Sequence, residues 1–250
     1  MGNNLYTTTI LKAFDILDSF TDDCQENGIS EISAAVGMPI SSVHRIIQSL
    51  EYEGALIQNP ENKKYSLGTK LLSLSEKCNR YARFKQTAIK YADQLSKLTE
   101  ETVNLTTCTG DQITHIYIAP SHYVLRPNFP LNVSFPGYNT SVGRIFLSEM
   151  SDTTLKWIYE NSKGDIHMTQ QEFLSMLHRF KKDGYALDDG DFNVGLRCVA
   201  APVKLSGGAT VFAINISAPA SRMNDARYVQ ARDLVVEYAA LLSQQLQMLE

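Results

Sequence analysis

Residues 37–56, "GMPISSVHRIIQSLEYEGAL", combine an apolar stripe with side chains that could read DNA bases. Apolar residues recur at the i, i+3, i+4, i+7 spacing of an amphipathic helix, at Ile40, Val43, Ile46, Ile47 and Leu50. The opposite surface carries hydroxyls, an amide, a guanidinium and an imidazole. Arg can bond guanine, Gln can bond adenine, and Ser can reach a base or a phosphate. The candidate DNA contacts on this helix are Ser41, Ser42, His44, Arg45 and Gln48.

The neighbouring elements decide between a DNA-reading helix and an amphipathic helix with a merely polar outer face. Residues 29–37 predict a short helix with Ser30 as its N-cap and Gly37 at its end, and Pro39 suits the first turn of the next helix. Two helices joined by a short turn containing Gly form the helix-turn-helix pattern. A further helix is predicted over residues 8–19.

A hairpin is predicted after the second of these helices. The strand-like runs "ALIQ" and "KYSL" flank "NPENK" at residues 59–63, which has the composition of a turn. We expect Lys63, Lys64 and Tyr65 to lie at the tip and to contact phosphate. Helix, helix-turn-helix and hairpin together predict a winged helix-turn-helix module.

A second candidate site lies where residues 139–150, "NTSVGRIFLSEM", begin a helix. Asn139 or Thr140 is the expected N-cap. A helix N-terminus presents free N–H groups and the positive end of the helix dipole, so it can bind a carboxylate. The available N–H groups are those of Ser141 and Val142.

The second half of the chain alternates predicted strands and helices. "TVNLTTCT" and "QITHIYIAP" are strand-like runs split by Gly110-Asp111, and "LRCVAAPVKL" and "ATVFAINISAP" are split by Ser206-Gly207-Gly208. Helices are predicted over 67–84, 85–101, three segments between 141 and 184, and about 223–248. This predicts an α+β domain with an antiparallel sheet, following a winged domain over 1–80 and spanning 81–250.

Composition favours a cytoplasmic globular protein. The net charge is −4, and residues 1–80 hold 7 Lys or Arg against 10 Asp or Glu, so most acidic residues of the first domain must lie away from DNA. The four cysteines, Cys24, Cys78, Cys108 and Cys198, form no zinc-binding or disulfide pattern. Residues 1–10 lack the features of a signal peptide, and no apolar run is long enough to span a membrane.

Other patterns in the second half are poor candidates for chemistry. "DDGDFNVG" invites a calcium interpretation, but Val194 and Ala200 stand where the EF-hand pattern needs Gly and Glu. A cysteine hydrolase using Cys198 would need a nearby His, and the sequence points to none, since His115 lies in an unrelated segment. Arg197 is interpreted as a structural ion-pair partner, and Trp157 as a core residue.

The stretch "ISEISAAVGMPISSVHRIIQSLEYEGALIQNPENKKYSLGTKLLSLS" resembles the N-terminal domain of the isocitrate lyase regulator (IclR) family of bacterial transcription factors. "DGYALDDGDFNVGLRCVAAPV" and "AINISAPASR" resemble the C-terminal domain of that family. The resemblance covers about residues 8–248. It implies a winged helix-turn-helix domain, a linker helix and a GAF-like α+β effector-binding domain, with no cofactor and no metal.

The resemblance also implies which residues bind the effector. Backbone groups at Ser141 and Val142 would hold its carboxylate, and Asp188, Cys198, Asn215 and Ser217 would complete the pocket. The family usually has Ala or Gly at 141, Lys at 144 and Ser at 215, where this chain has Ser, Arg and Asn. Three side chains in and near the pocket therefore differ from the usual family residues, so we expect this chain to bind a different effector.

We therefore expect a transcriptional regulator that binds operator DNA as a dimer or tetramer and responds to a small organic acid, a hydroxy or keto acid. An alternative is an enzyme that acts on a small carboxylic acid and keeps a vestigial DNA-binding domain. A third is a module that contacts protein through its helix-turn-helix. Turnover of the acid would identify the enzyme, and salt-dependent operator binding would exclude the protein-binding module.

Overall fold

The computed structural model describes residues 7–21, 24–77 and 79–250, so residues 1–6 and Cys78, discussed above, lie outside the described residues. The chain divides into two compact units, Met1–Asn79 and Arg80–Glu250. Within the described residues, no helix is both long enough and apolar enough to cross a bilayer.

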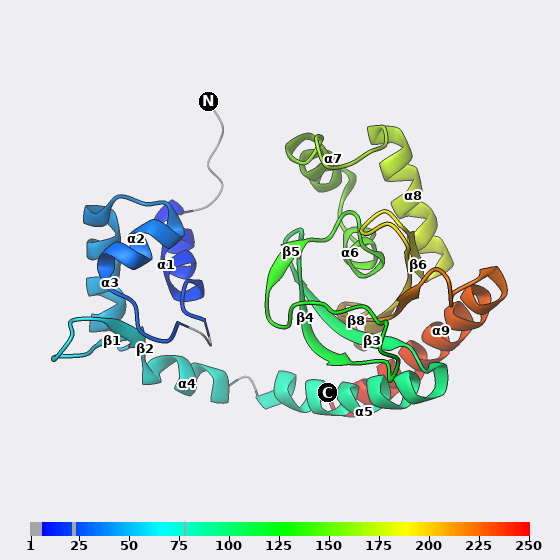
Figure 1. Ribbon diagram of the computed structural model, residues 1–250, viewed down its shortest axis with the longest axis horizontal. Helices are drawn as coiled ribbons and strands as arrows, with labels where there is room; N and C mark the ends of the chain where they lie inside the picture. The colour runs from blue at the N-terminus through cyan, green and yellow to red at the C-terminus, as the bar shows by residue number, and fades with distance from the viewer. Residues whose placement is uncertain (1–6, 22–23, 78) are drawn as a thin grey trace. The chain divides into compact units, whose positions relative to one another are not determined.

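The first unit is a winged helix-turn-helix, and α3 lies against α1 and α2 (Figure 1). Its elements are α1 (Thr8–Asp18), α2 (Ile29–Val36), α3 (Ile40–Tyr52), β1 (Leu56–Gln58), β2 (Tyr65–Leu67) and α4 (Thr69–Glu76). Gly37 ends α2 with a left-handed φ of 63°, which a residue with a Cβ adopts at a cost. Pro39 then precedes α3 as its N-cap, so the tight turn between the two helices follows from local chemistry.

Two details of these helices differ from the prediction. The N-cap of α2 is Gly28, whose N–H donates to the Glu31 carboxylate at 2.6 Å, and Ser30 lies inside the helix. Ile40, predicted on the apolar stripe of α3, is 54% exposed because it lies at the start of the helix, ahead of the packed turns.

The second unit contains a six-stranded antiparallel sheet with helices on both faces. Its strand order is β5-β4-β3-β8-β7-β6, from β3 (Thr102–Thr109), β4 (Gln112–Ala119), β5 (Ser134–Pro136), β6 (Ala186–Asp189), β7 (Leu196–Lys204) and β8 (Thr210–Pro219). The helices are α5 (Asn79–Thr99), α6 (Ser141–Leu147), α7 (Asp152–Asn161), α8 (Gln170–Asp183) and α9 (Asp225–Gln247). Figure 1 shows α6 lying inside the curve of this sheet.

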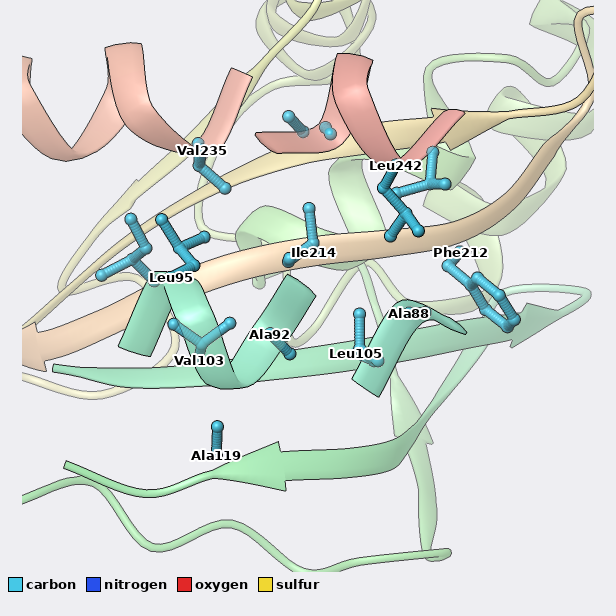
Figure 2. Packing of buried hydrophobic residues seen from close by; sticks show 14 of the residues in the cluster. Ala88, Ala92, Leu95, Val103, Leu105, Ala119, Phe212, Ile214, Val235 and Leu242 are labelled. Carbon is cyan, nitrogen blue, oxygen red and sulfur yellow. The ribbon is translucent and has the colours of Figure 1, made fainter. Parts of the chain in front are cut away.

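One face of the sheet is apolar and carries α5 and α9. Alternating strand residues point to this face, and Figure 2 shows them packed against small and branched residues of the two helices. The cluster includes Ala88, Ala92, Leu95, Val103, Leu105, Ile214, Val235 and Leu242. Each fully buried Val, Leu or Ile side chain contributes about 1.5–3 kcal/mol, so this layer holds the unit together.

The opposite face of the sheet is curled around α6 and is partly polar. Side chains of β3 alternate between the two faces of the sheet. Val103 and Leu105 point to α5, so Asn104 and Thr106 point to the opposite face. In a flat sheet β4 and β6 would be ~19 Å apart, at four strand spacings. Residues of both strands line one cavity beside α6, so the curl of the sheet creates the site.

A β-bulge interrupts the alternation of β4 next to this face. Leu105 pairs with Tyr117 while Thr106 pairs with His115, so Ile116 is the extra residue. A bulge re-aims the side chains beside it, and here it places the His115 ring opposite Thr106 on the polar face.

Most predicted elements of this unit are present, and two strands were missed. β5 and β6 are short and lie at the two edges of the sheet, where neither length nor alternation distinguishes a strand from a loop. The interpretation of Trp157 as a core residue is wrong, because its side chain is 63% exposed while Leu155, Ile158 and Tyr159 form the buried side of α7.

Candidate functional site

The outer face of α3 presents the predicted DNA-reading residues together. Val43, Ile46 and Ile47 turn inward and are buried. Among the predicted contacts, Ser42 is half-buried and the others are exposed: Ser41, His44, Arg45 and Gln48. A helix whose inner face is held by the core and whose outer face is free can enter a major groove without unfolding.

The wing is organised by contacts to the segment before α2. The Glu26 carboxylate accepts hydrogen bonds from Asn59 Nδ2 at 3.2 Å and Asn62 Nδ2 at 2.8 Å. Lys64 forms an ion pair with Glu31 at 3.1 Å, whereas Lys63 at the turn is exposed. The two lysines therefore differ in how freely they can reach a phosphate.

The predicted phosphate contact by Tyr65 is wrong. Tyr65 begins β2 and is 4% exposed, packed in the core of the first unit with Ile16 and Leu56. Its backbone bonds Asn27 in both directions, at 2.8 and 2.9 Å, which holds the side chain inward. The alternation of a two-stranded wing places one of two successive residues on the core side, and here that residue is the aromatic one.

The second unit contains a small pocket of about 20 Å³ beside α6, close to the volume that one water molecule needs. We call it the polar pocket. All six residues predicted to bind the effector line it. Its lining is His115, Phe129, Phe135, Thr140, Ser141, Val142, Asp188, Phe192, Cys198, Asn215 and Ser217.

The start of α6 forms one wall of the polar pocket. Thr140 is the N-cap, its Oγ1 accepting from the Gly143 N–H at 3.0 Å and its carbonyl from the Arg144 N–H at 3.0 Å. This leaves the N–H groups of Ser141 and Val142, as predicted, free of intrahelical bonds. The buried Ser141 hydroxyl also has no hydrogen-bond partner in the described part of the chain.

A second wall carries the Asp188 carboxyl, which is 1% exposed. Its Oδ1 accepts from the backbone N–H groups of Asp191 at 2.8 Å and Phe192 at 3.3 Å. Burial raises the pKa of Asp188 to about 6, although the Arg144 guanidinium and these two hydrogen bonds favour the anion. Asp188 is therefore mainly ionised at neutral pH and close to its titration range.

Arg144 is a buried cation that ties α6 to the strands behind it. Its Nε donates to the Tyr138 carbonyl at 3.2 Å and its Nη1 to the Leu187 carbonyl at 2.7 Å. Nη2 forms an ion pair with Asp191 at 2.9 Å. Nη2 has no hydrogen-bond partner among the described residues, but the two hydrogen bonds and the ion pair fix the guanidinium between α6 and the strands.

A row of hydrogen-bonded side chains crosses the sheet beneath the pocket. Asn104 Nδ2 donates to Asn215 Oδ1 at 3.1 Å, Asn215 Nδ2 to Ser217 Oγ at 2.8 Å, and Ser217 Oγ to Cys198 Sγ at 3.1 Å. Asn215 is thus satisfied by neighbouring side chains, and within this row Asn104 Oδ1 is a buried atom with no partner among the described residues. Asn104 was not predicted from sequence, because its role depends on the β3–β8 register.

The structure brings His115 and Cys198 to one cavity, so the expectation that no His lies near Cys198 is wrong. The reason is the curl of the sheet, which joins residues of β4 and β7. Burial raises the pKa of the Cys198 thiol and lowers the pKa of His115 to about 4. The pair stays a neutral thiol and a neutral imidazole, whereas a cysteine nucleophile needs a thiolate.

The remaining sequence interpretations concern charges near the pocket. Arg197 is confirmed as an ion-pair partner, contacting Asp189 at 2.6 Å and Asp225 at 2.7 Å. Among the described residues, no group of three His, Cys, Asp or Glu is placed to hold a metal ion.

Comparisons with known proteins agree with both units. Residues 9–60 match the family model of the IclR helix-turn-helix domain, and residues 81–244 match that of the bacterial transcriptional regulator IclR C-terminal domain. The HTH-type transcriptional regulator KdgR of Escherichia coli (strain K12) is 30% identical over 240 residues, covering 94% of this chain and 88% of that protein.

Solved structures show the same fold at lower identity. An IclR transcriptional regulator from Alicyclobacillus acidocaldarius superposes with a TM-score of 0.73 at 21% identity, covering 97% of this chain and 99% of that one. An IclR homologue from Microbacterium hydrocarbonoxydans, complexed with 4-hydroxybenzoate, gives a TM-score of 0.73 at 16% identity, covering 96% and 99%. With a winged helix-turn-helix, an α+β domain around a polar pocket and matches to both family models, this chain belongs to the IclR family of bacterial transcriptional regulators.

Proposed function

We propose that this regulator binds operator DNA as a dimer through α3 and the wing, and that a small organic acid in the polar pocket alters its affinity for DNA. The observation that carries the proposal is the polar pocket itself. It collects hydrogen-bonding groups from four strands and a helix N-terminus, in a chain that also carries a winged helix-turn-helix. As a bacterial DNA-binding regulator, it would act in the cytoplasm.

The chemistry of the pocket favours a hydroxy acid or a hydrated keto acid. The carboxylate would accept hydrogen bonds from the free N–H groups of Ser141 and Val142. Asp188, mainly ionised at neutral pH, would repel a second carboxylate and accept a hydrogen bond from a ligand hydroxyl. The ligand of the Microbacterium homologue, 4-hydroxybenzoate, is a hydroxy acid and supports this class.

Self-association is supported by an exposed apolar stripe on α1. Phe14 lies four residues after Ile10 and three after Leu11, so the three side chains share one face of the helix, and they are 61%, 58% and 48% exposed. Only the opposite side of α1, at Ile16, is buried. A second copy of the chain that covered this stripe would also supply the second recognition helix that a two-fold operator needs.

The test starts from DNA selected out of a random duplex library by the full chain. Binding of the selected duplex is measured by fluorescence anisotropy at several salt concentrations, with and without millimolar glycolate, lactate, pyruvate, benzoate or 4-hydroxybenzoate. We expect steep salt dependence and an affinity change with at least one acid, typically 5–150-fold. Asp188→Ala should abolish the response and keep DNA binding.

Two results would contradict the proposal. If no sequence is enriched by selection, the chain is not an operator-binding protein. If DNA binding is tight but no acid alters it, the acid-responsive part fails. Steady turnover of a bound acid would instead favour an enzyme.

A further inference from the structure

His115 also lines the polar pocket, but the proposed binding of a carboxylate at the start of α6 gives it no role, and the family resemblance assigns it none. Its side chain is 3% exposed, and its Nδ1 is 2.8 Å from Thr106 Oγ1. The structure gives no hydrogen bond from Nε2 to any residue it describes. A buried imidazole normally satisfies both nitrogens, so Nε2 is a group that a ligand could complete.

The imidazole and the Asp188 carboxyl come from strands near opposite ends of the sheet order. His115 belongs to β4 and Asp188 to β6, with β3, β8 and β7 between them. Because the sheet curls, both line the same pocket, so a ligand there meets the imidazole and the carboxyl from different strands.

Aromatic rings close the pocket around the imidazole. The His115 ring lies 5.1 Å from that of Phe129 and 5.3 Å from that of Phe135, and Phe192 lies 5.8 Å from Phe135. These side chains come from three separate segments: the one that joins β4 to β5, β5 itself, and the loop after β6. The middle of the pocket is therefore apolar, and it suits a planar or aliphatic ligand body.

Resting on the function proposed above, we propose that His115 is a specificity residue of the effector site, whose Nε2 binds a hydroxyl at the end of the ligand opposite its carboxylate. A hydroxyl both donates and accepts, so it can pair with either imidazole tautomer. A second carboxylate can only accept, and no Lys or Arg side chain is among the described residues that line the pocket, so its charge would not be neutralised there. The ligand class is a monocarboxylic acid with an apolar body and a distal hydroxyl.

The pKa of His115, lowered by burial to about 4, agrees with this assignment. The imidazole is neutral over the physiological range, so it discriminates by hydrogen bonding and not by charge. The cavity of about 20 Å³ is smaller than such an acid, so the Phe129 and Phe192 side chains must move aside when it binds.

The test uses acid pairs that differ in one hydroxyl, benzoate against 4-hydroxybenzoate and butanoate against 4-hydroxybutanoate. Calorimetry on the full chain measures their dissociation constants. We expect the hydroxylated member of at least one pair to bind about tenfold more tightly, the factor for one hydrogen bond.

Two substitutions at one position separate ligand binding from structure. In His115→Asn the side-chain amide lies where Nδ1 was and can still bond Thr106, but no polar atom replaces Nε2 in the cavity. In His115→Gln the amide takes the place of Nε2. We expect His115→Asn to abolish the preference for the hydroxylated acid while leaving affinity for its partner acid unchanged, and His115→Gln to keep the preference.

A measurement on the wild-type chain tests the same role for His115 even if one of the variants does not fold. With ¹⁵N-labelled histidine, the Nε2 resonance of His115 should shift on addition of the hydroxylated acid and not its partner. An unchanged preference in a folded His115→Asn, or an unmoved resonance in the saturated complex, overturns the role of His115 while the proposed function stands. If no acid binds and none alters DNA affinity, both fail together.

Discussion

At the scale of single residues, the buried Asp188 carboxyl links the pocket to pH. Its pKa is raised to about 6, so between about pH 4 and 6 the folded chain keeps a proton that the unfolded chain has lost. The stability contributed by this group is therefore present at low pH and declines as pH rises through 6. The rise from the ordinary 3.8 to about 6 corresponds to about 3 kcal/mol.

We therefore expect Asp188→Asn to increase the free energy of unfolding by up to about 3 kcal/mol at pH 7.5, and by less at pH 4.5. The amide oxygen can still accept from the Asp191 and Phe192 N–H groups. Urea denaturation of the two proteins at both pH values checks this. An equal increase in the free energy of unfolding at the two pH values would contradict the raised pKa of Asp188.

Also at the residue scale, Arg45 and Lys63 should have different effects on DNA binding. Arg45→Ala removes an exposed side chain suited to a base edge, so we expect a loss of about 1–3 kcal/mol of binding free energy for the selected operator and little change for unrelated DNA.

Lys63→Ala should weaken binding to every sequence and reduce the slope of log affinity against log salt concentration by about 1. Lys64→Ala should do less, because Lys64 is already paired with Glu31. Anisotropy titrations in a salt series measure all three, and equal losses on operator and random DNA for Arg45→Ala would contradict the assignment of α3.

At the scale of elements, the position of α6 depends on a contact between two glycines. A Cβ added to Gly143 would lie 2.1 Å from the Gly137 carbonyl oxygen, so the helix start and the preceding turn would have to separate. We expect Gly143→Ala to destabilise the second unit by about 1–3 kcal/mol, the usual cost of overpacking, and to abolish the response to acids.

The matched control is Gly164→Ala, where an added Cβ meets nothing within 4 Å. Thermal unfolding and acid-dependent DNA binding compare the two variants. A Gly143→Ala protein with unchanged stability and an unchanged acid response would show that α6 tolerates displacement and does not set the pocket.

At the scale of the whole molecule, self-association should depend on the apolar stripe of α1. Phe14→Glu places a charge where 61% of the side chain is exposed, so folding should be unaffected while a second copy is repelled. Sedimentation velocity should show a shift toward monomer, and operator binding should weaken at the same chain concentration. Trp157→Glu, at a 63% exposed residue of α7 in the second unit, is the control. If Phe14→Glu sediments as the wild type does, the stripe is not the association surface.

Local chemistry was sufficient to predict α3 and the start of α6. Gly37, Pro39 and the spacing of Val43, Ile46 and Ile47 act over fewer than two helical turns, so they can be interpreted without knowing what packs against them. The same holds for Thr140, whose capping bond reaches only to Gly143. Asp188, Cys198, Asn215 and Ser217 came from the resemblance to a family, and no local pattern would have brought them together.

Only the tertiary structure placed His115, Asn104 and Tyr65. His115 reaches the pocket because a bulge re-aims β4 and because the sheet curls until β4 and β6 line one cavity. Asn104 meets Asn215 because β3 pairs with β8, more than a hundred residues away in sequence. Tyr65 turns inward because the wing packs on the helices. Each outcome depends on strand register and packing between distant segments, whereas hydrophobic periodicity reports only the neighbours along the chain.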